Sequence, residues 1–259
     1  MYDVTATGEL LIDFTRNGLS EQNNRIYEAN PGGAPCNVLA MLGKLGYKTA
    51  FIGKVGNDEF GKLLKNTITE QKIDASGLIL DSNAKTTLAF VDNDETGDRS
   101  FSFYRKPGAD MMLKEDEVNY ELIDNCRIFH FGSLSMTDEP VRSATYAMID
   151  YAKKKNKIIS FDPNLRPPLW ESEELAAKQI WYGIEQCDIL KIADNEIEWL
   201  TGTDDYDQGI EIIRQRTHAK LINVTLGPNG SIAYYGDHKV FMEPYLNENT
   251  IETTGAGDT

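Results

Sequence analysis

The sequence predicts an α/β fold in which helices cover a large sheet and a smaller sheet stands apart from it. The first observation is that strand and helix patterns alternate, as in a strand at 127–131, a helix that ends at 153–155 and a strand at 157–161. Such alternation is typical of βα units. The second is a set of strand patterns, within about 11–30 and 86–106, that lie outside this alternation.

The composition describes one domain over the 259 residues and excludes several classes of partner. Hydrophobic residues make up 41% and charged residues 26%, as in ordinary soluble proteins. The formal net charge of -15 disfavours nucleic acid and anionic membranes. No apolar run could span a bilayer, and no signal peptide opens the chain, so we expect a cytoplasmic protein. The three cysteines and three histidines are scattered and predict neither disulfides nor a metal cluster.

The first strand is expected at 4–8, with 10–14 as its continuation. Asp13 interrupts this apolar run. It is either a strand-end residue that faces water or a residue that binds a polar group, and the strand alone does not decide between the two. Residues 25–29 alternate between apolar and polar, as a half-exposed strand does.

A Gly-rich stretch at 30–37 precedes a helix that ends at Gly46. Gly32 and Gly33 would let a ligand approach the backbone closely, and Asn37 offers both a donor and an acceptor to a hydroxyl. The alternative is a simple helix start with Asn37 facing solvent.

Two strand patterns, at 86–91 and 99–105, flank a polar turn and predict a hairpin. With the strands around Asp13 and Tyr27 they make a small four-stranded sheet. Its apolar face should either cover a substrate or pair with a second subunit, giving a homodimer.

Polar residues follow two strands of the large sheet, where ligands of open α/β sheets bind. Arg166 follows the strand at 157–161, and its guanidinium matches phosphate geometry. Asn164 and Asp162 organise this loop or its waters. After the strand at 188–193, Lys191 could face phosphates from the strand end, while Asn195 could equally be a helix N-cap.

The last segment, 251–259, looks like a strand that turns into a helix. Gly255, Ala256 and Gly257 would present bare N–H groups as an anion cradle, and Asp258 could take a proton from a hydroxyl. The alternative is a Gly-rich turn capped by Asp.

The two Gly-rich stretches, in this order, resemble the two signatures of the PfkB (ribokinase-like) carbohydrate kinases, and 101–110 resembles bacterial and plant fructokinases. The resemblance implies a ribokinase-like three-layer αβα sandwich with a small β-sheet lid. It implies transfer of the γ-phosphoryl of ATP, with Mg²⁺, to a sugar hydroxyl, with D-fructose as the leading substrate. The alternatives are a 2-keto-3-deoxygluconate kinase, another sugar kinase of this family and a sugar-binding regulatory pseudokinase.

The resemblance also implies residue roles. Asp258 would be the general base beside the Gly255–Gly257 cradle, and the sugar would lie among Asp13, Gly32, Gly33, Asn37, Phe103, Arg105 and Arg166. Nucleotide contacts would come from Asn164, Lys191, Asn195, Thr225, Gly227 and Gly230, and Glu198 would hold a hydrated Mg²⁺.

Two departures from the family pattern stand out. Glu252 replaces an Asp in a region that helps to hold a monovalent cation, so potassium is a candidate and not a required cofactor. Family members also continue beyond the catalytic Asp, whereas this chain ends at Thr259. We therefore expect a truncated version of a longer kinase, with the adenine pocket formed by later residues.

Overall fold

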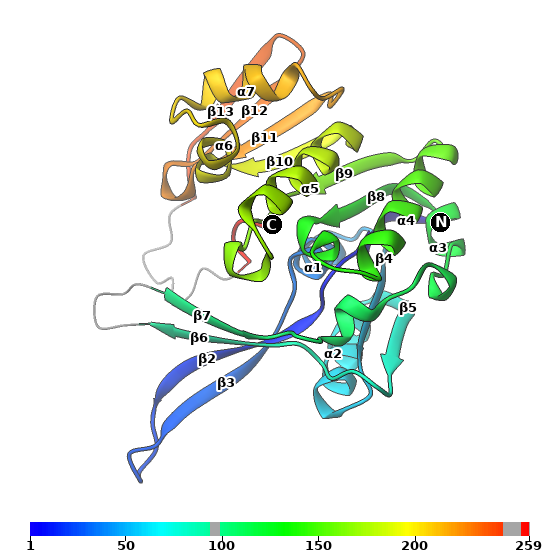
Figure 1. The fold of residues 1–259 in the computed structure, drawn as a ribbon, viewed down its shortest axis with the longest axis vertical. Helices are drawn as coiled ribbons and strands as arrows, with labels where there is room; N and C mark the ends of the chain where they lie inside the picture. Colours follow the sequence, from blue (N-terminus) through cyan, green and yellow to red (C-terminus); the bar gives the residue numbers. More distant parts are fainter. Residues whose placement is uncertain (94–98, 246–254, 259) are drawn as a thin grey trace.

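The computed structural model describes residues 1–93, 99–245 and 255–258, which form two sheets flanked by helices (Figure 1). In the described residues the large sheet has nine strands in the order β13-β12-β11-β10-β9-β8-β1-β4-β5. They are β1 (Tyr2–Thr7), β4 (Thr49–Gly56), β5 (Ile73–Asp81), β8 (Cys126–Gly132), β9 (Ile158–Asp162), β10 (Ile189–Ala193), β11 (Leu221–Thr225), β12 (Ser231–Tyr235) and β13 (His238–Met242). The last two pair antiparallel at one edge, and the other strands are parallel.

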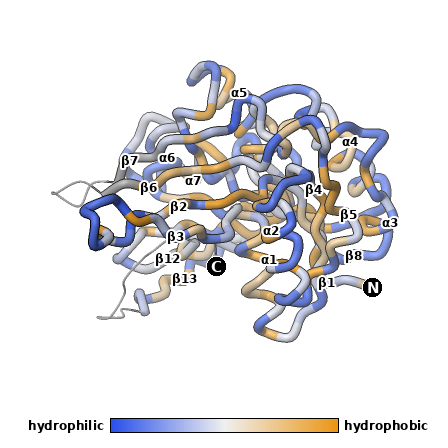
Figure 2. Tube along the Cα trace, turned by 90° about the horizontal axis from the view of Figure 1, so that it is seen from below, coloured by the Kyte–Doolittle hydropathy of each residue, from blue (hydrophilic) through white to orange (hydrophobic). Residues whose placement is uncertain are grey.

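Two layers of helices bury the faces of this sheet, which confirms the three-layer prediction. Helices α1 (Ala34–Lys44) and α2 (Glu59–Glu70) pack on one face, where Leu39 and Leu64 join Phe51 in one apolar cluster. The other face carries α3 (Glu121–Asp124), α4 (Val141–Lys154), α5 (Glu173–Gln186), α6 (Asp194–Thr201) and α7 (Tyr206–Arg214). The inner strands, such as β4, are orange in Figure 2 because they consist mostly of apolar residues, which two-sided burial requires.

The small sheet has the strand order β3-β2-β6-β7 and projects from one end of the large sheet (Figure 1). Its strands are β2 (Leu11–Leu19), β3 (Arg25–Gly32), β6 (Leu88–Asn93) and β7 (Arg99–Tyr104). The predicted antiparallel pairing of β6 with β7 is present, and most of the turn between them lies outside the described residues. We call this sheet the lid.

The prediction that 10–14 continues the first strand was wrong. Strands β1 and β2 belong to different sheets. Gly8 separates them with a φ of 153°, and a Cβ there would lie 2.6 Å from Cγ of Pro35. The chain therefore changes direction at a position that only glycine can occupy easily.

None of the described helices is long and apolar enough to cross a membrane.

Asp58 joins α2 to the strand that leads into the lid. Its carboxylate accepts hydrogen bonds from the N–H of Gly61 (2.9 Å), the N–H of Thr86 (3.0 Å) and the hydroxyl of Thr86 (2.7 Å). Burial works to raise the pKa of Asp58, but these hydrogen bonds outweigh it and hold the pKa below its usual value.

We expect Asp58→Ala to lower the free energy of unfolding by about 2 kcal/mol at pH 7, because it removes a helix cap and leaves the Thr86 N–H without its acceptor. Since the folded-state pKa is lowered, this stabilisation should be complete above the unfolded pKa and disappear as pH falls below about 4. Urea unfolding at several pH values measures both effects. Glu70→Ala, at the exposed end of α2, is the control and should stay within about 0.5 kcal/mol.

Candidate active site

A cavity of about 200 Å³ lies between the lid and the edge of the large sheet. Its walls include Asp13 and Phe103 from the lid, Asn37 from α1, and Lys191 and Asp258 from the sheet side. We call it the lid cavity. The structure thus brings together residues that are far apart in the sequence and that were predicted to hold a sugar, to act on it or, for Lys191, to contact the nucleotide.

The two glycines before α1 are required by close contacts. A Cβ on Gly32 would lie 2.2 Å from the Oδ2 atom of Asp13. Gly33 has a φ of 126°, and a Cβ there would lie 2.4 Å from the carbonyl oxygen of Glu9. The glycines therefore let the helix start pack directly against the strand that carries Asp13.

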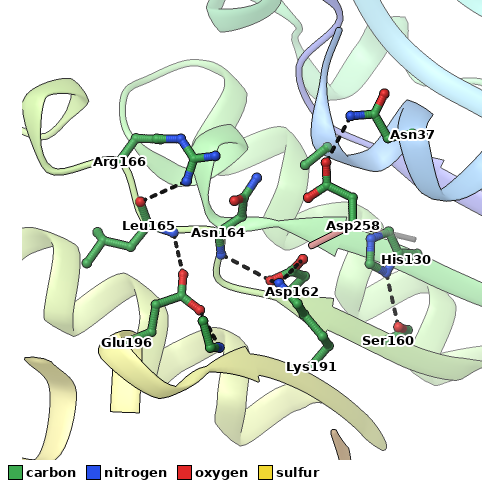
Figure 3. Close-up of polar contacts among 12 residues, drawn as sticks. Asn37, His130, Ser160, Asp162, Asn164, Leu165, Arg166, Lys191, Glu196 and Asp258 are labelled. Carbon is green, nitrogen blue, oxygen red and sulfur yellow. Dashed lines mark hydrogen bonds and ion pairs between the residues drawn. The ribbon is translucent and has the colours of Figure 1, made fainter. Parts of the chain in front are cut away.

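Asp258 is held at this cavity by Asn37. The Nδ2 group of Asn37 donates to Oδ2 of Asp258 at 2.8 Å, and Figure 3 shows the two side chains pointing toward each other. Residues 255–258 form a turn in which the N–H of Asp258 donates to the carbonyl of Gly255 (3.1 Å). The strand expected at 251–254, including Glu252, and the continuation at Thr259 lie outside the described residues.

Lys191 brings a positive charge to the same turn. Its Nζ lies 3.1 Å from Oδ2 of Asp162, and a Cβ on Gly257 would lie 3.8 Å from that Nζ. Asp162 is buried and also accepts the N–H of Asn164 (3.2 Å). Burial raises the pKa of Asp162, while the charge of Lys191 acts in the opposite direction. Asp162 thus fixes the lysine and the loop behind it.

His130, at the end of β8, adds no charge to this region. Its Nδ1 lies 3.0 Å from the hydroxyl of Ser160 (Figure 3). Burial, together with the charge of Lys191, lowers the pKa of His130 to about 4, so the ring is neutral at pH 7.

A second cavity, of about 370 Å³, adjoins the first along the edge of the sheet. Asn195 and Thr225 line it, as their predicted role requires. It shares four wall residues with the lid cavity, namely Asn164, Arg166, Lys191 and Gly257. We call it the edge cavity. Two compartments therefore meet at the turn that carries Asp258.

Arg105 does not reach either cavity, in contrast to the expectation that it contacts the substrate. Only 3% of it is exposed. Its Nε lies 2.8 Å from Oδ2 of Asp110, and its two terminal nitrogens donate to the Thr137 hydroxyl (3.0 Å) and the Leu134 carbonyl (2.8 Å). Each nitrogen of the guanidinium therefore has a partner, and these bonds join the end of β7 to the core.

Five further predicted residues line neither cavity. Gly32 and Ala256 line a neighbouring cavity of about 300 Å³, which shares Asn37 and Gly255 with the lid cavity. Glu198 is exposed on α6 and lines neither cavity, and the described residues contain no group of three His, Cys, Asp or Glu side chains that could hold a metal. Gly227 and Gly230 also lie off the walls. A Cβ on Gly230 would lie 2.2 Å from the carbonyl oxygen of Met242, so this glycine permits the close approach of β13.

Two acids at the site were not predicted from the sequence. Glu196 accepts the N–H of Leu165 (2.6 Å) and the N–H of Ala193 (2.9 Å), so it ties the loop of Arg166 to the start of α6 (Figure 3). Glu9 lines the lid cavity. The sequence signal for Glu9 was an acid directly after Gly8 at a strand end. For Glu196 it was an acid in the first turn of an expected helix, which by itself indicates only a helix start.

Comparison with known proteins agrees with this arrangement. The family model described as pfkB family carbohydrate kinase matches residues 1–259. The chain is 42% identical over 258 residues to probable fructokinase-2 of Arabidopsis thaliana, a match that covers 99% of this chain and 78% of that protein.

Two solved structures have a similar fold. A fructokinase from Xylella fastidiosa with bound ATP has a TM-score of 0.89 and 32% identity, covering 100% of this chain and 79% of that one. A double mutant of fructokinase from Vibrio cholerae O395, with fructose, ADP and potassium ion bound, has a TM-score of 0.88 and 32% identity, covering 100% of this chain and 80% of that one.

We expect Asp110→Ala to lower the free energy of unfolding by about 3 kcal/mol, because it leaves the buried guanidinium of Arg105 without its counter-ion. Chemical denaturation measures the change. The matched control is Glu211→Ala, which breaks an exposed ion pair with Arg214 and should cost less than about 0.5 kcal/mol. Equal losses in the two variants would contradict the structural role of Arg105.

Proposed function

The chain belongs to the pfkB family of carbohydrate kinases, phosphotransferases whose acceptor is an alcohol group, and we propose that it transfers the γ-phosphoryl group of ATP to a hydroxyl of D-fructose. The observation that carries the proposal is the shared wall between the lid cavity and the edge cavity, with Asp258 at the junction. Phosphoryl transfer needs two substrates held in line at one point, and catalysis comes mostly from positioning and charge stabilisation.

Asp258 acts as the general base in this proposal. Asn37 holds its Oδ2 atom, so Oδ1 is the oxygen offered to a sugar hydroxyl in the lid cavity. The carboxylate takes the hydroxyl proton as the oxygen attacks the γ-phosphorus. Asp13 and Asn37 bind the other hydroxyls, and Phe103 forms an apolar wall.

The negative charge that moves onto the transferred phosphoryl is stabilised at the junction. Gly255 and Gly257 lie on one side, and Lys191 and Arg166 lie on the wall that both cavities share. A fixed ammonium and guanidinium in a partly buried site stabilise such charge more than water would.

The charges favour a neutral sugar over an acid sugar. Among the described residues, the cations that line the lid cavity are Arg166 and Lys191, and both also line the edge cavity where the phosphates are placed. Arg105, the candidate for a sugar carboxylate, pairs with Asp110 instead. The rest of the lid cavity presents Asp13 and Glu9, which would repel the carboxylate of 2-keto-3-deoxygluconate.

The described residues suit a Mg²⁺ ion that is bound to ATP better than one that is coordinated by protein side chains alone. Glu198 lies off the walls, both oxygens of Glu196 accept backbone N–H groups, and Asp162 pairs with Lys191. Mg²⁺ keeps most of its waters in phosphate sites, where it neutralises phosphate charge.

Potassium remains a candidate cation because the Vibrio cholerae relative was solved with it. The cytoplasmic location stays a prediction.

The outer face of the lid is proposed to pair with a second copy of the chain. Phe14 and Phe90 stack with ring centroids 4.9 Å apart, and Tyr27 and Tyr104 pack edge-on against Phe90. Tyr104 is 67% exposed, so this aromatic cluster offers an apolar surface.

We expect Tyr104→Asp to shift the protein from dimer to monomer, because it places a charge on the most exposed ring of that surface. Sedimentation velocity at several concentrations measures the change. Tyr235→Asp, which alters an exposed tyrosine on β12, serves as the control and should leave the sedimentation profile unaltered. A monomeric unsubstituted protein would contradict the proposed pairing.

Asp258→Asn should lower kcat for fructose phosphorylation by about two orders of magnitude or more, because the amide cannot accept the hydroxyl proton. Fructose binding should change much less. A coupled ADP-release assay measures turnover, and titration calorimetry measures binding. Turnover within a few-fold of the unsubstituted protein would refute the assignment of the base.

A sugar panel in the same assay separates the alternatives. Fructose should be phosphorylated with a higher kcat/KM than 2-keto-3-deoxygluconate, and the reverse order would favour the acid-sugar kinase. Fructose binding without ATP binding or turnover would favour the regulatory pseudokinase.

A further inference from the structure

Glu9 is a buried acid in the lid cavity that the reaction described above does not use. It lies in the short connection between β1 and β2, and only 4% of it is exposed. Asn37 and Asp258 line the same cavity. A buried carboxylate is costly, so its presence beside the reacting groups calls for a role.

Glu9 provides the hydrogen-bond acceptor for the start of α1. Its Oε1 atom accepts the N–H of Ala34 at 2.8 Å, across 25 positions of sequence. The N-cap residue Gly33 has no side chain to do this, and Pro35 has no N–H. The carbonyl oxygen of Glu9 also lies only 2.4 Å from the place that a Cβ of Gly33 would take, so the side chain and the backbone of Glu9 both contact the helix start.

Asn37 lies on the first turn of this helix. Its N–H donates to the carbonyl of Gly33 at 3.0 Å, and its Nδ2 donates to Asp258 at 2.8 Å. A shift of the helix start would therefore move the group that orients the Asp258 carboxylate.

Charged groups of both signs surround Glu9. The pKa of Glu9 is raised to about 7, mainly by burial; the bond from Ala34 and the charge of Arg105 lower it, and Asp110 raises it. Asp13, Asp258, Arg166 and Lys191 line the same cavity. An apolar side chain would avoid this desolvation, but it could not accept the Ala34 N–H.

We propose that Glu9 is a positioning residue, which holds the start of α1 so that Asn37 keeps the Asp258 carboxylate aimed at the sugar hydroxyl. This inference rests on the proposed kinase function for its effect on rate, while the geometry it describes can be tested separately.

The first test compares Glu9→Met, which keeps the side-chain length and loses the acceptor, with Glu9→Gln, which keeps an acceptor oxygen. Glu9→Met should lower kcat with fructose about tenfold or more and raise the KM for fructose. The KM for ATP should not change, because Glu9 does not line the edge cavity. Glu9→Gln should restore kcat to within about threefold of the unsubstituted protein. Equal losses in the two variants overturn the proposal, as does a wild-type kcat in Glu9→Met.

The second test asks whether Glu9 acts through Asn37. In an Asn37→Ala background, Glu9→Met should lower kcat by less than about twofold, because the group that it positions is already gone. A tenfold loss in that background overturns the proposal. Glu70→Ala is the matched control and should leave all constants unchanged.

The third test uses the unsubstituted protein and does not depend on enzymatic activity. In the unsubstituted protein, the NMR signals of the Ala34 amide and the Asn37 side-chain amide should move together with one midpoint as Glu9 gains its proton, above the usual range of a glutamate because burial raises the pKa of Glu9. An Ala34 amide that does not respond to this titration, or Ala34 and Asn37 signals with separate midpoints, overturns the proposal. Absence of turnover in the unsubstituted protein would instead count against the kinase function.

Discussion

The hydrogen bond between Asn37 and Asp258 is the contact on which the rest of the site depends. It joins residues 221 positions apart and closes the gap between the first helix and the C-terminal turn. Because of it, the lid cavity and the edge cavity share a wall at the point where a hydroxyl and a phosphate would meet. Several nearby residues position α1, which carries Asn37, for this contact. Gly32 and Gly33 let α1 approach the strand of Asp13, and Glu9 holds the helix start from the other side.

Positive and negative side chains are distributed unevenly around this contact. A chain with a net charge of -15 can therefore still offer a locally positive site to a nucleotide. The sugar side is acidic or neutral. Lys191 and Arg166 lie at the wall between the cavities, where Asp162 fixes the lysine and Glu196 ties down the loop of the arginine. His130 is neutral because burial and Lys191 oppose its protonation. Positive charge is therefore concentrated where phosphoryl charge would develop.

The lid is attached to the core by buried polar contacts at its base. Arg105, directly after β7, pairs with Asp110 and also bonds to the Leu134 carbonyl, while the Leu134 residue itself lines the lid cavity. The Thr87 hydroxyl, directly before β6, bonds to the other oxygen of Asp110. The buried carboxylate of Asp110 thus binds the ends of two lid strands, β6 and β7. An arginine at the end of a predicted lid strand was a reasonable candidate for a substrate contact, but the local sequence does not show which acid lies beside it.

The sequence by itself determined the alternation of strands and helices, the four lid segments, the two Gly-rich stretches and the candidates Asn37 and Asp258. The strands, helices and turns follow from local periodicity and from the conformational freedom of glycine, which act over a few residues. Asn37 and Asp258 were favoured as functional residues by the resemblance of the two Gly-rich stretches to the pfkB signatures. Only the tertiary structure decided that the chain changes direction at Gly8 between β1 and β2, that Arg105 is committed to Asp110, that Glu198 lines neither cavity, and that Glu9 accepts the Ala34 N–H at the start of α1. Each of these depends on burial or on a partner distant in sequence, and the free energy of a charged group is set by what surrounds it in space.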